Sequence, residues 1–260
     1  MQDAIETGLL GPDDPPPVKQ LEAESPLPLL LVCEHAGRGI PQRLGDLGLA
    51  SGELDRHIGW DIGAAAVAEE ISRRLSAPLI LQHYSRLVID CNRPTQVPSS
   101  IPEVSDGTLV PGNRNLSDQA RHARVAEIFT PFAEAVRAAL DSRPRRLLAT
   151  IHSYTPVLQG VARPWEIGLL FNRDDRAARR LLPLLTAARP GLVAALNEPY
   201  AVSDDSDYTI PVHGEARGIA HVLIEVRNDL IATPEGARTW AALLSDGLAA
   251  LLNQELPSLA

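Results

Sequence analysis

The chain has 260 residues, of which 45% are hydrophobic and 22% charged, and its formal net charge is −9. This length and composition are typical of a soluble globular protein with a sizeable core, built as one large α/β domain or at most two small ones. The acidic balance argues against non-specific binding to nucleic acid or to an anionic membrane, although a local cluster of arginines can still receive a small anionic substrate.

The first 26 residues differ in composition from the rest of the chain. They are rich in acids and prolines, with GPDDPPP at their centre. Such a composition favours a mobile or loosely draped lead-in over a part of the core. We therefore expect a mobile N-terminal segment over residues 1–26 and one folded domain over residues 27–260.

Short apolar runs predict the strands of this domain. Each run has about the length of a strand, and most are largely apolar, as expected for strands that are covered on both faces. The predicted strands are 28–33, 78–82, 86–90, 147–151, 167–171 and 220–226.

Apolar residues at helical spacing predict helices between these strands, over residues 61–76, 118–140, 174–188 and 234–252. Ser117 or Asp118 is the expected cap of the second helix, and Pro131 is expected to break or kink it. Thr233 followed by Pro234 is a good start signal for the last helix. The alternation predicts an α/β fold: a single three-layer domain whose mainly parallel or mixed sheet has helices on both faces.

Ligands of such sheets bind at the carboxyl ends of the strands, so polar residues at strand ends are the candidates for a site. The segment 91–117 is a further candidate, because it is long, polar and rich in Pro, Gly and Asn. Loops of that length inside a domain are often functional.

Three histidines occupy positions that suit a metal site. His35 follows the first apolar strand, His57 lies just before a predicted helix, and His152 follows another strand. With Asp61 as a further oxygen donor or a supporting acceptor, they can supply the three protein ligands that a catalytic zinc ion typically has. The alternative is that they are hydrogen-bonded, partly buried side chains, and spacing alone leaves the two interpretations about equal.

Two arginines flank the run 86–90. Arg86 and Arg93 each carry a planar guanidinium, which can hold a carboxylate through two hydrogen bonds, and Asn92 can add an amide donor. Asp90 is expected to pair with one of the arginines as a structural ion pair. The other arginine is then left for a substrate.

Glu225 lies inside the apolar run VLIEV. A carboxylate in such surroundings is costly unless it is paired or desolvated for a function. Arg227, two residues further on, is its structural partner if the strand continues. Desolvation would instead raise the pKa of Glu225, which suits a general base that takes a proton from water.

Six motifs together resemble the N-formylglutamate amidohydrolase family, roughly over residues 29–251. They are CEHAG…IP, D-x-H-x-x-x-D-x-G, SR-x-V-x-D-x-NRP, HSY, N-x-PY and IEVRND. The resemblance implies a fold like that of zinc carboxypeptidases, with a mixed sheet between helices. It also implies metal-assisted hydrolysis, with zinc as the expected ion, of the N-acyl amide of an amino acid such as N-formyl-L-glutamate, giving formate and the free amino acid.

By position, the resemblance places His35 on the histidine of the family motif HSG, which is HAG in this chain. DRHI resembles the DWHV part of the pattern DTDWHVD, so His57 keeps the family histidine. The acid that closes this pattern falls on Gly59, and Asp61 is its candidate replacement, which leaves His57 and Asp61 as alternative third ligands. His152 matches the histidine after a central strand.

The resemblance also implies roles around this metal. Glu225 matches a general base, Arg93 with Asn92 resembles a pair that grips a substrate carboxylate, and Arg86 can polarise the scissile carbonyl or hold a second carboxylate. Glu34 is then expected to be a hydrogen-bond acceptor that orients a ligand or an arginine.

The substrate-binding set implied by the resemblance further includes Asn197, His213 and Arg227. Tyr200 is expected to do no more than pack in its loop. Two alternatives remain: a metallo-hydrolase for another N-acyl amino acid or a small peptide, and a non-catalytic relative that binds a ligand. A nucleophilic cysteine is a weaker third option.

Cys33 and Cys91 both lie at or near the ends of apolar runs, which favours buried, reduced thiols. The start of the chain lacks the basic and apolar regions of a signal peptide, and no apolar run reaches the roughly 18 residues of a membrane span. We therefore expect a cytoplasmic enzyme that binds neither nucleic acid nor membrane. Its oligomeric state cannot be derived from the sequence.

Overall fold

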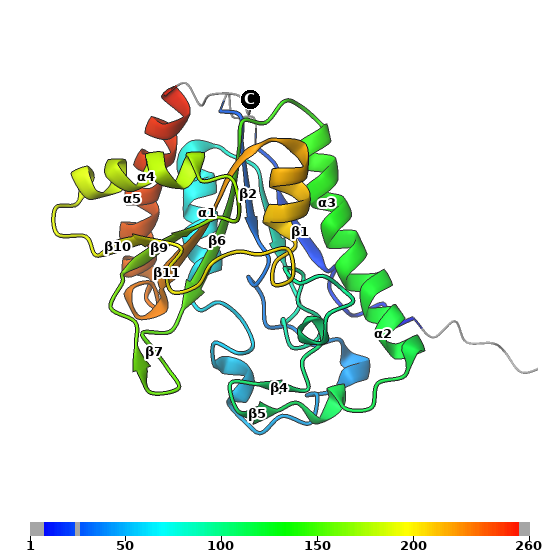
Figure 1. The fold of residues 1–260 in the computed structure, drawn as a ribbon. Coiled ribbons are helices and arrows are strands. Elements are labelled where there is room, and N and C mark those ends of the chain that lie inside the picture. Colours follow the sequence, from blue (N-terminus) through cyan, green and yellow to red (C-terminus); the bar gives the residue numbers. More distant parts are fainter. Residues whose placement is uncertain (1–7, 24–26, 255–260) are drawn as a thin grey trace, which may run out of the picture.

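Seven strands form one mixed sheet at the centre of the computed structural model, which describes residues 8–23 and 27–254 (Figure 1). Helices cover both faces, so the predicted three-layer α/β domain is confirmed. Across the sheet the strands are β1 (Val18–Leu21), β3 (Leu79–Gln82), β2 (Leu29–Cys33), β6 (Leu147–Tyr154), β11 (Ala220–Arg227), β9 (Ile167–Leu170) and β10 (Ala194–Leu196).

The four strands β3, β2, β6 and β11 run parallel to one another. β1 is antiparallel to β3, and β9 is antiparallel to β11, while β10 runs parallel to β9. The carboxyl ends of β2, β6 and β11 therefore meet at one edge of the sheet, where a ligand site is expected.

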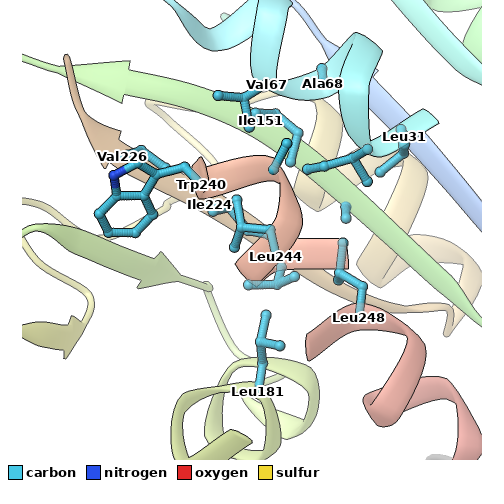
Figure 2. Packing of buried hydrophobic residues seen from close by; sticks show 14 of the residues in the cluster. Leu31, Val67, Ala68, Ile151, Leu181, Ile224, Val226, Trp240, Leu244 and Leu248 are labelled. Atoms are coloured by element: carbon cyan, nitrogen blue, oxygen red, sulfur yellow. The ribbon is translucent and has the colours of Figure 1, made fainter. Parts of the chain in front are cut away.

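One face of the sheet is covered by α1 (Ala64–Leu75), α4 (Arg176–Ala188) and α5 (Pro234–Asn253). Figure 2 shows side chains of the sheet, such as Ile151 and Ile224, in one apolar cluster with Trp240 and Leu244 of α5. As predicted, α5 begins at a Thr233 cap, whose hydroxyl accepts a hydrogen bond from the Gly236 amide. Among the described helices, none has both the length and the apolar character needed to cross a bilayer.

α3 (Thr130–Asp141) covers the other face and continues α2 (Asp118–Arg124) through a π-helical turn, Val125–Phe129. The cap of α2 is Ser117, whose hydroxyl accepts from the Ala120 amide. Pro131 lies in the first turn of α3, just after the π-helical turn. It therefore coincides with a change in helix type and does not end the helical run.

The predicted strand 86–90 is wrong, because this segment is a turn. Leu87, Val88 and Ile89 are buried in the cluster under α3, which explains their apolar character. Their backbone is satisfied without a strand partner: the Val88 carbonyl, for example, accepts from the buried guanidinium of Arg124 at 2.8 Å. A short buried run cannot be assigned to a strand by its periodicity alone.

The N-terminal segment also differs from expectation in its described part. Val18–Leu21 is an edge strand that pairs antiparallel with β3, and Leu9 is buried. Its two middle residues, Lys19 and Gln20, are polar and exposed, so the sequence of this edge strand lacks a continuous apolar run. Residues 1–7 and 24–26 lie outside the described part of the chain.

Two small hairpins extend from the edge at which β2, β6 and β11 end. β4 (Val104–Ser105) pairs with β5 (Thr108–Leu109) within the long segment 91–117, and β7 (Val157–Leu158) pairs with β8 (Val161–Ala162) directly after β6. Figure 1 shows both hairpins at the bottom of the view, below the sheet.

Candidate active site

Three of the candidate side chains come from the ends of neighbouring parallel strands. Glu225 of β11 pairs in register with His152 of β6, and Glu34 directly follows β2. Ile151 and Ile224, which precede two of these residues, point into the cluster under α5. Because strand side chains alternate between faces, His152 and Glu225 point to the opposite face.

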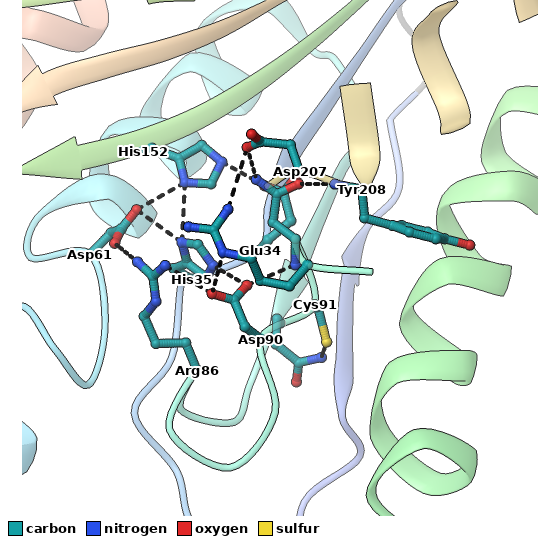
Figure 3. Close-up of polar contacts among 12 residues, drawn as sticks. Glu34, His35, Asp61, Arg86, Asp90, Cys91, His152, Asp207 and Tyr208 are labelled. Atoms are coloured by element: carbon teal, nitrogen blue, oxygen red, sulfur yellow. Dashed lines mark hydrogen bonds and ion pairs between the residues drawn. The ribbon is translucent and has the colours of Figure 1, made fainter. Parts of the chain in front are cut away.

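His35, Asp61 and His152 converge in a buried group (Figure 3), which we call the ligand group. The Nδ1 atom of His152 lies 2.9 Å from Asp61 Oδ2 and 3.2 Å from His35 Nδ1. His35 Nδ1 is 3.3 Å from the same carboxylate oxygen. Each residue thus presents one donor atom to a common point, although they come from three separate parts of the chain.

The outer nitrogen of each histidine faces a second carboxylate. His35 Nε2 is 2.7 Å from Asp90 Oδ1, and His152 Nε2 is 3.0 Å from Glu34 Oε2. Histidines that bind a metal commonly have this arrangement, in which a carboxylate on one nitrogen fixes the ring and leaves the other nitrogen for the ion. Two imidazoles and one carboxylate are also a donor set that zinc accepts. The residues present therefore fit a divalent ion.

Arg86 joins two of these carboxylates. Its guanidinium lies 2.8 Å from Asp90 Oδ2 and 3.3 Å from Asp61 Oδ1. Burial opposes the ionisation of Asp61, but the two histidines outweigh burial and hold its pKa below the ordinary value. Burial likewise lowers the pKa of His152, yet Glu34 and Asp61 outweigh it and raise that pKa. The group is thus strongly polar although it is nearly closed to solvent.

Glu225 lies beside the ligand group, and its carboxyl group has an unusually high pKa. It is 2% exposed, and burial raises its pKa to about 8, against the opposing effect of His152. One carboxylate oxygen accepts a hydrogen bond from the hydroxyl of Tyr200, and the other has no hydrogen-bond partner among the described residues. A carboxyl group of this kind is suited to exchange a proton near neutral pH.

Two expectations about Glu225 need correction. Tyr200, expected to pack only in its loop, reaches the site and donates to Glu225. Arg227 does not pair with Glu225, because its guanidinium is held by Asp229 at 2.8 Å and by the Trp165 carbonyl. The N-x-PY motif singles out Tyr200 in the sequence, but it does not reveal the contact with Glu225.

A cavity of about 320 Å³ adjoins the ligand group. Arg86, Asp90 and Arg93 line it, together with His57 and the β4–β5 hairpin. Asn92, by contrast, is fully used in the protein: its amide donates to Asp207, and its oxygen accepts from the backbone amides of residues 208 and 209. Arg93 is therefore the member of this pair that a ligand can reach.

The structure keeps three other candidates apart from the ligand group. His57 lies in the wall of the cavity, 3.7 Å from Asp106. Asn197 accepts a hydrogen bond from the Phe171 amide and so joins two loops. His213 is buried, and neither of its ring nitrogens has a hydrogen-bond partner among the described residues.

Comparisons with known proteins identify the family and the fold of this chain. The model of the N-formylglutamate amidohydrolase family matches residues 27–232. A gene product of Agrobacterium tumefaciens has a similar structure, with 37% sequence identity and a TM-score of 0.88 over 94% of this chain and 98% of that chain. An N-formylglutamate amidohydrolase from Ralstonia eutropha is 19% identical, with a TM-score of 0.64 over 91% of this chain and 97% of that chain, which supports the fold alone. No curated protein matches the sequence. The chain therefore belongs to the N-formylglutamate amidohydrolase family and is a hydrolase that acts on amide bonds.

Proposed function

We propose that this protein is a metal-dependent amidohydrolase that cleaves the N-acyl amide, and in particular the N-formyl amide, of an amino acid such as N-formylglutamate. The products are formate and the free amino acid. The observation that carries the proposal is the pair of buried histidines, each of which turns Nδ1 toward Asp61 while a carboxylate holds Nε2. Family membership supports the reaction class.

His35, Asp61 and His152 are the ligands in this proposal, and the ion is divalent, with zinc as the first choice. Asp61 takes the place of the third ligand, because the side chain of His57 is in contact with Asp106 in the cavity wall. When bound, the ion supplies a Lewis acid beside the scissile carbonyl and makes water at the site more acidic.

Glu225 is the general base. Its strand register places it beside His152, and its raised pKa allows it both to accept a proton and to release one. In the proposed reaction the carboxylate takes a proton from the attacking water and then delivers it to the departing amine. The hydroxyl of Tyr200 holds one oxygen of the carboxylate, which leaves the other oxygen for the proton.

Two arginines have separate roles. Arg86 keeps Asp61 and Asp90 in place, and in the proposed reaction its positive charge stabilises the negative charge that develops on the carbonyl oxygen. Arg93 binds the substrate carboxylate and so fixes the substrate relative to the ligand group. The substrate is thus a small anionic N-acyl amino acid.

The test combines metal content with activity. The purified protein should contain a divalent metal and release formate from N-formyl amino acids, and Glu225→Gln should lower kcat by at least about 100-fold without loss of metal. Glu235→Gln, which removes an exposed carboxylate at the start of α5, is the matched control and should be fully active. A metal-free protein, or a Glu225→Gln variant with wild-type activity, would refute the proposal.

The alternatives give different results in the same assays. A hydrolase for other N-acyl amino acids or small peptides would leave formyl substrates intact and cleave those compounds, whereas a non-catalytic relative would bind ligand whether or not Glu225 is present. A cysteine nucleophile has little support, since burial raises the pKa of both Cys33 and Cys91. Both thiols are free, which supports a reducing compartment such as the cytoplasm.

A further inference from the structure

The cavity beside the ligand group has two chemically different ends. We call the part lined by Arg86, Asp90 and Arg93 the inner end, because Asp90 and Arg86 contact His35 and Asp61 of the ligand group. We call the part lined by His57 and by Asp106 of the β4–β5 hairpin the outer end. Apolar surface in the same walls comes from Pro102 and Val104. The cavity can therefore take a molecule that has a charged group, an apolar stem and a further polar group.

The inner end holds the two arginines that can receive a carboxylate, Arg86 and Arg93. Arg86 is already held by Asp61 and Asp90 at hydrogen-bond distance. Arg93 has longer ion-pair contacts, 3.7 Å from its Nε to Asp90 and 3.7 Å from one terminal nitrogen to Asp207, and that terminal nitrogen also donates a hydrogen bond to the Ser206 carbonyl. Its Nε and its other terminal nitrogen form no hydrogen bond with the described residues. Arg93 is therefore the side chain that can best form a paired hydrogen bond with a carboxylate of a ligand.

The outer end is acidic. Asp106 lines the cavity, and its partner Arg56, 3.1 Å away, is also bound by Glu53 at 2.6 Å. Burial lowers the pKa of His57, so this imidazole is neutral at neutral pH. Among the described residues that line the cavity, Arg86 and Arg93 alone carry a permanent positive charge. A second carboxylate at the outer end would thus face Asp106, whose partner Arg56 is shared with Glu53 and does not line the cavity.

We propose that the cavity selects an amino-acid group that has one carboxylate and an uncharged, hydrogen-bond-donating side chain, of which a carboxamide is the best fit. The proposal rests on the proposed function, because it makes this cavity the amino-acid subsite of that reaction. Arg93 binds the carboxylate, the side-chain stem packs on the apolar surface, and the amide donates to Asp106. A side-chain carboxylate in the same place faces Asp106, and like charges at close range weaken binding.

N-formyl-L-glutamine and N-formyl-L-glutamate test this proposal as a matched pair, since they differ only in the group that reaches Asp106. The wild-type holoenzyme should show a kcat/KM for the glutamine substrate at least about tenfold higher than for the glutamate substrate. Asp106→Asn should remove most of this preference. Asparagine tolerates the positive φ of 43° at this position, so the hairpin should keep its shape.

Asp246→Asn is the control, because it removes the same charge from an exposed position on α5 and should leave the preference unchanged. A wild-type enzyme that prefers N-formyl-L-glutamate, or an Asp106→Asn variant with the wild-type preference, overturns the proposal.

Failure of the proposed function gives a separate result, in which neither substrate releases formate. The cavity is then tested by calorimetric titration of the wild-type protein and of Asp106→Asn with free L-glutamine and L-glutamate. Tighter binding of L-glutamine that is lost in the variant supports the proposed selectivity. Equal binding of the two amino acids, or tighter binding of L-glutamate, overturns it.

Discussion

Glu34 provides the sharpest test of the metal site, because its proposed role is to support a ligand without touching the ion. Its carboxylate lies 3.0 Å from His152 Nε2, and the Nδ1 atom of the same ring faces Asp61. If Nδ1 were the metal ligand, Nε2 would keep its proton and present it to the Glu34 carboxylate. Removing the carboxylate should therefore weaken metal binding through the orientation and the basicity of His152.

The expected magnitude follows from how closed this contact is. The side chains of Glu34 and His152 are 0% and 2% exposed, so water does not replace a lost carboxylate or screen its charge. Glu34→Ala leaves the imidazole without its acceptor and should weaken zinc affinity by about 100-fold, the upper end for such supporting residues. Glu34→Gln keeps an acceptor oxygen and loses the charge, so about tenfold is expected, or roughly 1.4 kcal/mol.

The assay is a competition titration of metal-free protein with zinc in the presence of a chelator of known affinity. Glu69→Gln is the matched control. It removes a carboxylate of α1 that pairs with the exposed Lys19 of β1, and this variant should bind zinc as the wild-type protein does. Thermal unfolding of each metal-free variant shows whether the fold is retained. If Glu34→Ala folds and binds zinc as tightly as the wild-type protein, His152 is not oriented by Glu34 and the proposed ligand arrangement is wrong.

Three further variants test other parts of the structure. Tyr200→Phe removes the hydrogen bond to Glu225 and should lower kcat by about tenfold with KM and metal content unchanged, whereas a change in KM alone would indicate a binding role. Burial lowers the pKa of His213 to about 4, below its ordinary value of 6.5, so the unfolded chain binds the proton more readily and stability is lost as the pH falls from 6.5 toward 4. Denaturant unfolding should show about 2 kcal/mol less stability at pH 5 than at pH 7 from this residue alone, and His213→Gln should abolish that part of the difference. Gly37→Ala would place a methyl group 1.9 Å from the backbone oxygen of His83, so it should cost about 3 kcal/mol in the same measurement and displace His35, while an unchanged free energy of unfolding would contradict the close approach.

The sequence predicts the central part of the sheet well, because β2, β6 and β11 are buried on both faces and therefore read as continuous apolar runs. It fails where burial and strand pairing do not coincide. β1 pairs at an edge and keeps polar residues, so it lacks the apolar signal. The segment 86–90 has that signal, yet its backbone bonds to side chains and turns elsewhere in the protein.

The site divides in the same way. His35 lies two residues after β2 and His152 lies near the carboxyl end of β6. Neighbouring parallel strands bring these ends together, so the proximity of the two histidines can be expected from the sequence. The choice between His57 and Asp61 depends on how the turn before α1 is placed, which local pattern does not specify. Tyr200 reaches Glu225 only because a loop after β10 returns over the strand ends, and no spacing along the sequence encodes that contact.

The balance of charge in the buried cluster gives an independent reason to expect a divalent ion. Three carboxylates, Glu34, Asp61 and Asp90, are nearly closed to solvent. Among the arginine and lysine side chains of the described residues, the guanidinium of Arg86 lies within hydrogen-bond distance of two of them, Asp61 and Asp90. With neutral histidines this cluster would bury an excess of negative charge, which is unfavourable in a poorly solvated site. Protons on both histidines can cancel the excess. Burial lowers the pKa of each ring, but the neighbouring carboxylates outweigh burial and raise the pKa values of both. A divalent cation at the common point of the Nδ1 atoms and Asp61 cancels the same charge while the histidines stay neutral, the form in which imidazole binds a metal. The carboxylates that make the metal-free site costly are thus the ones that favour the ion.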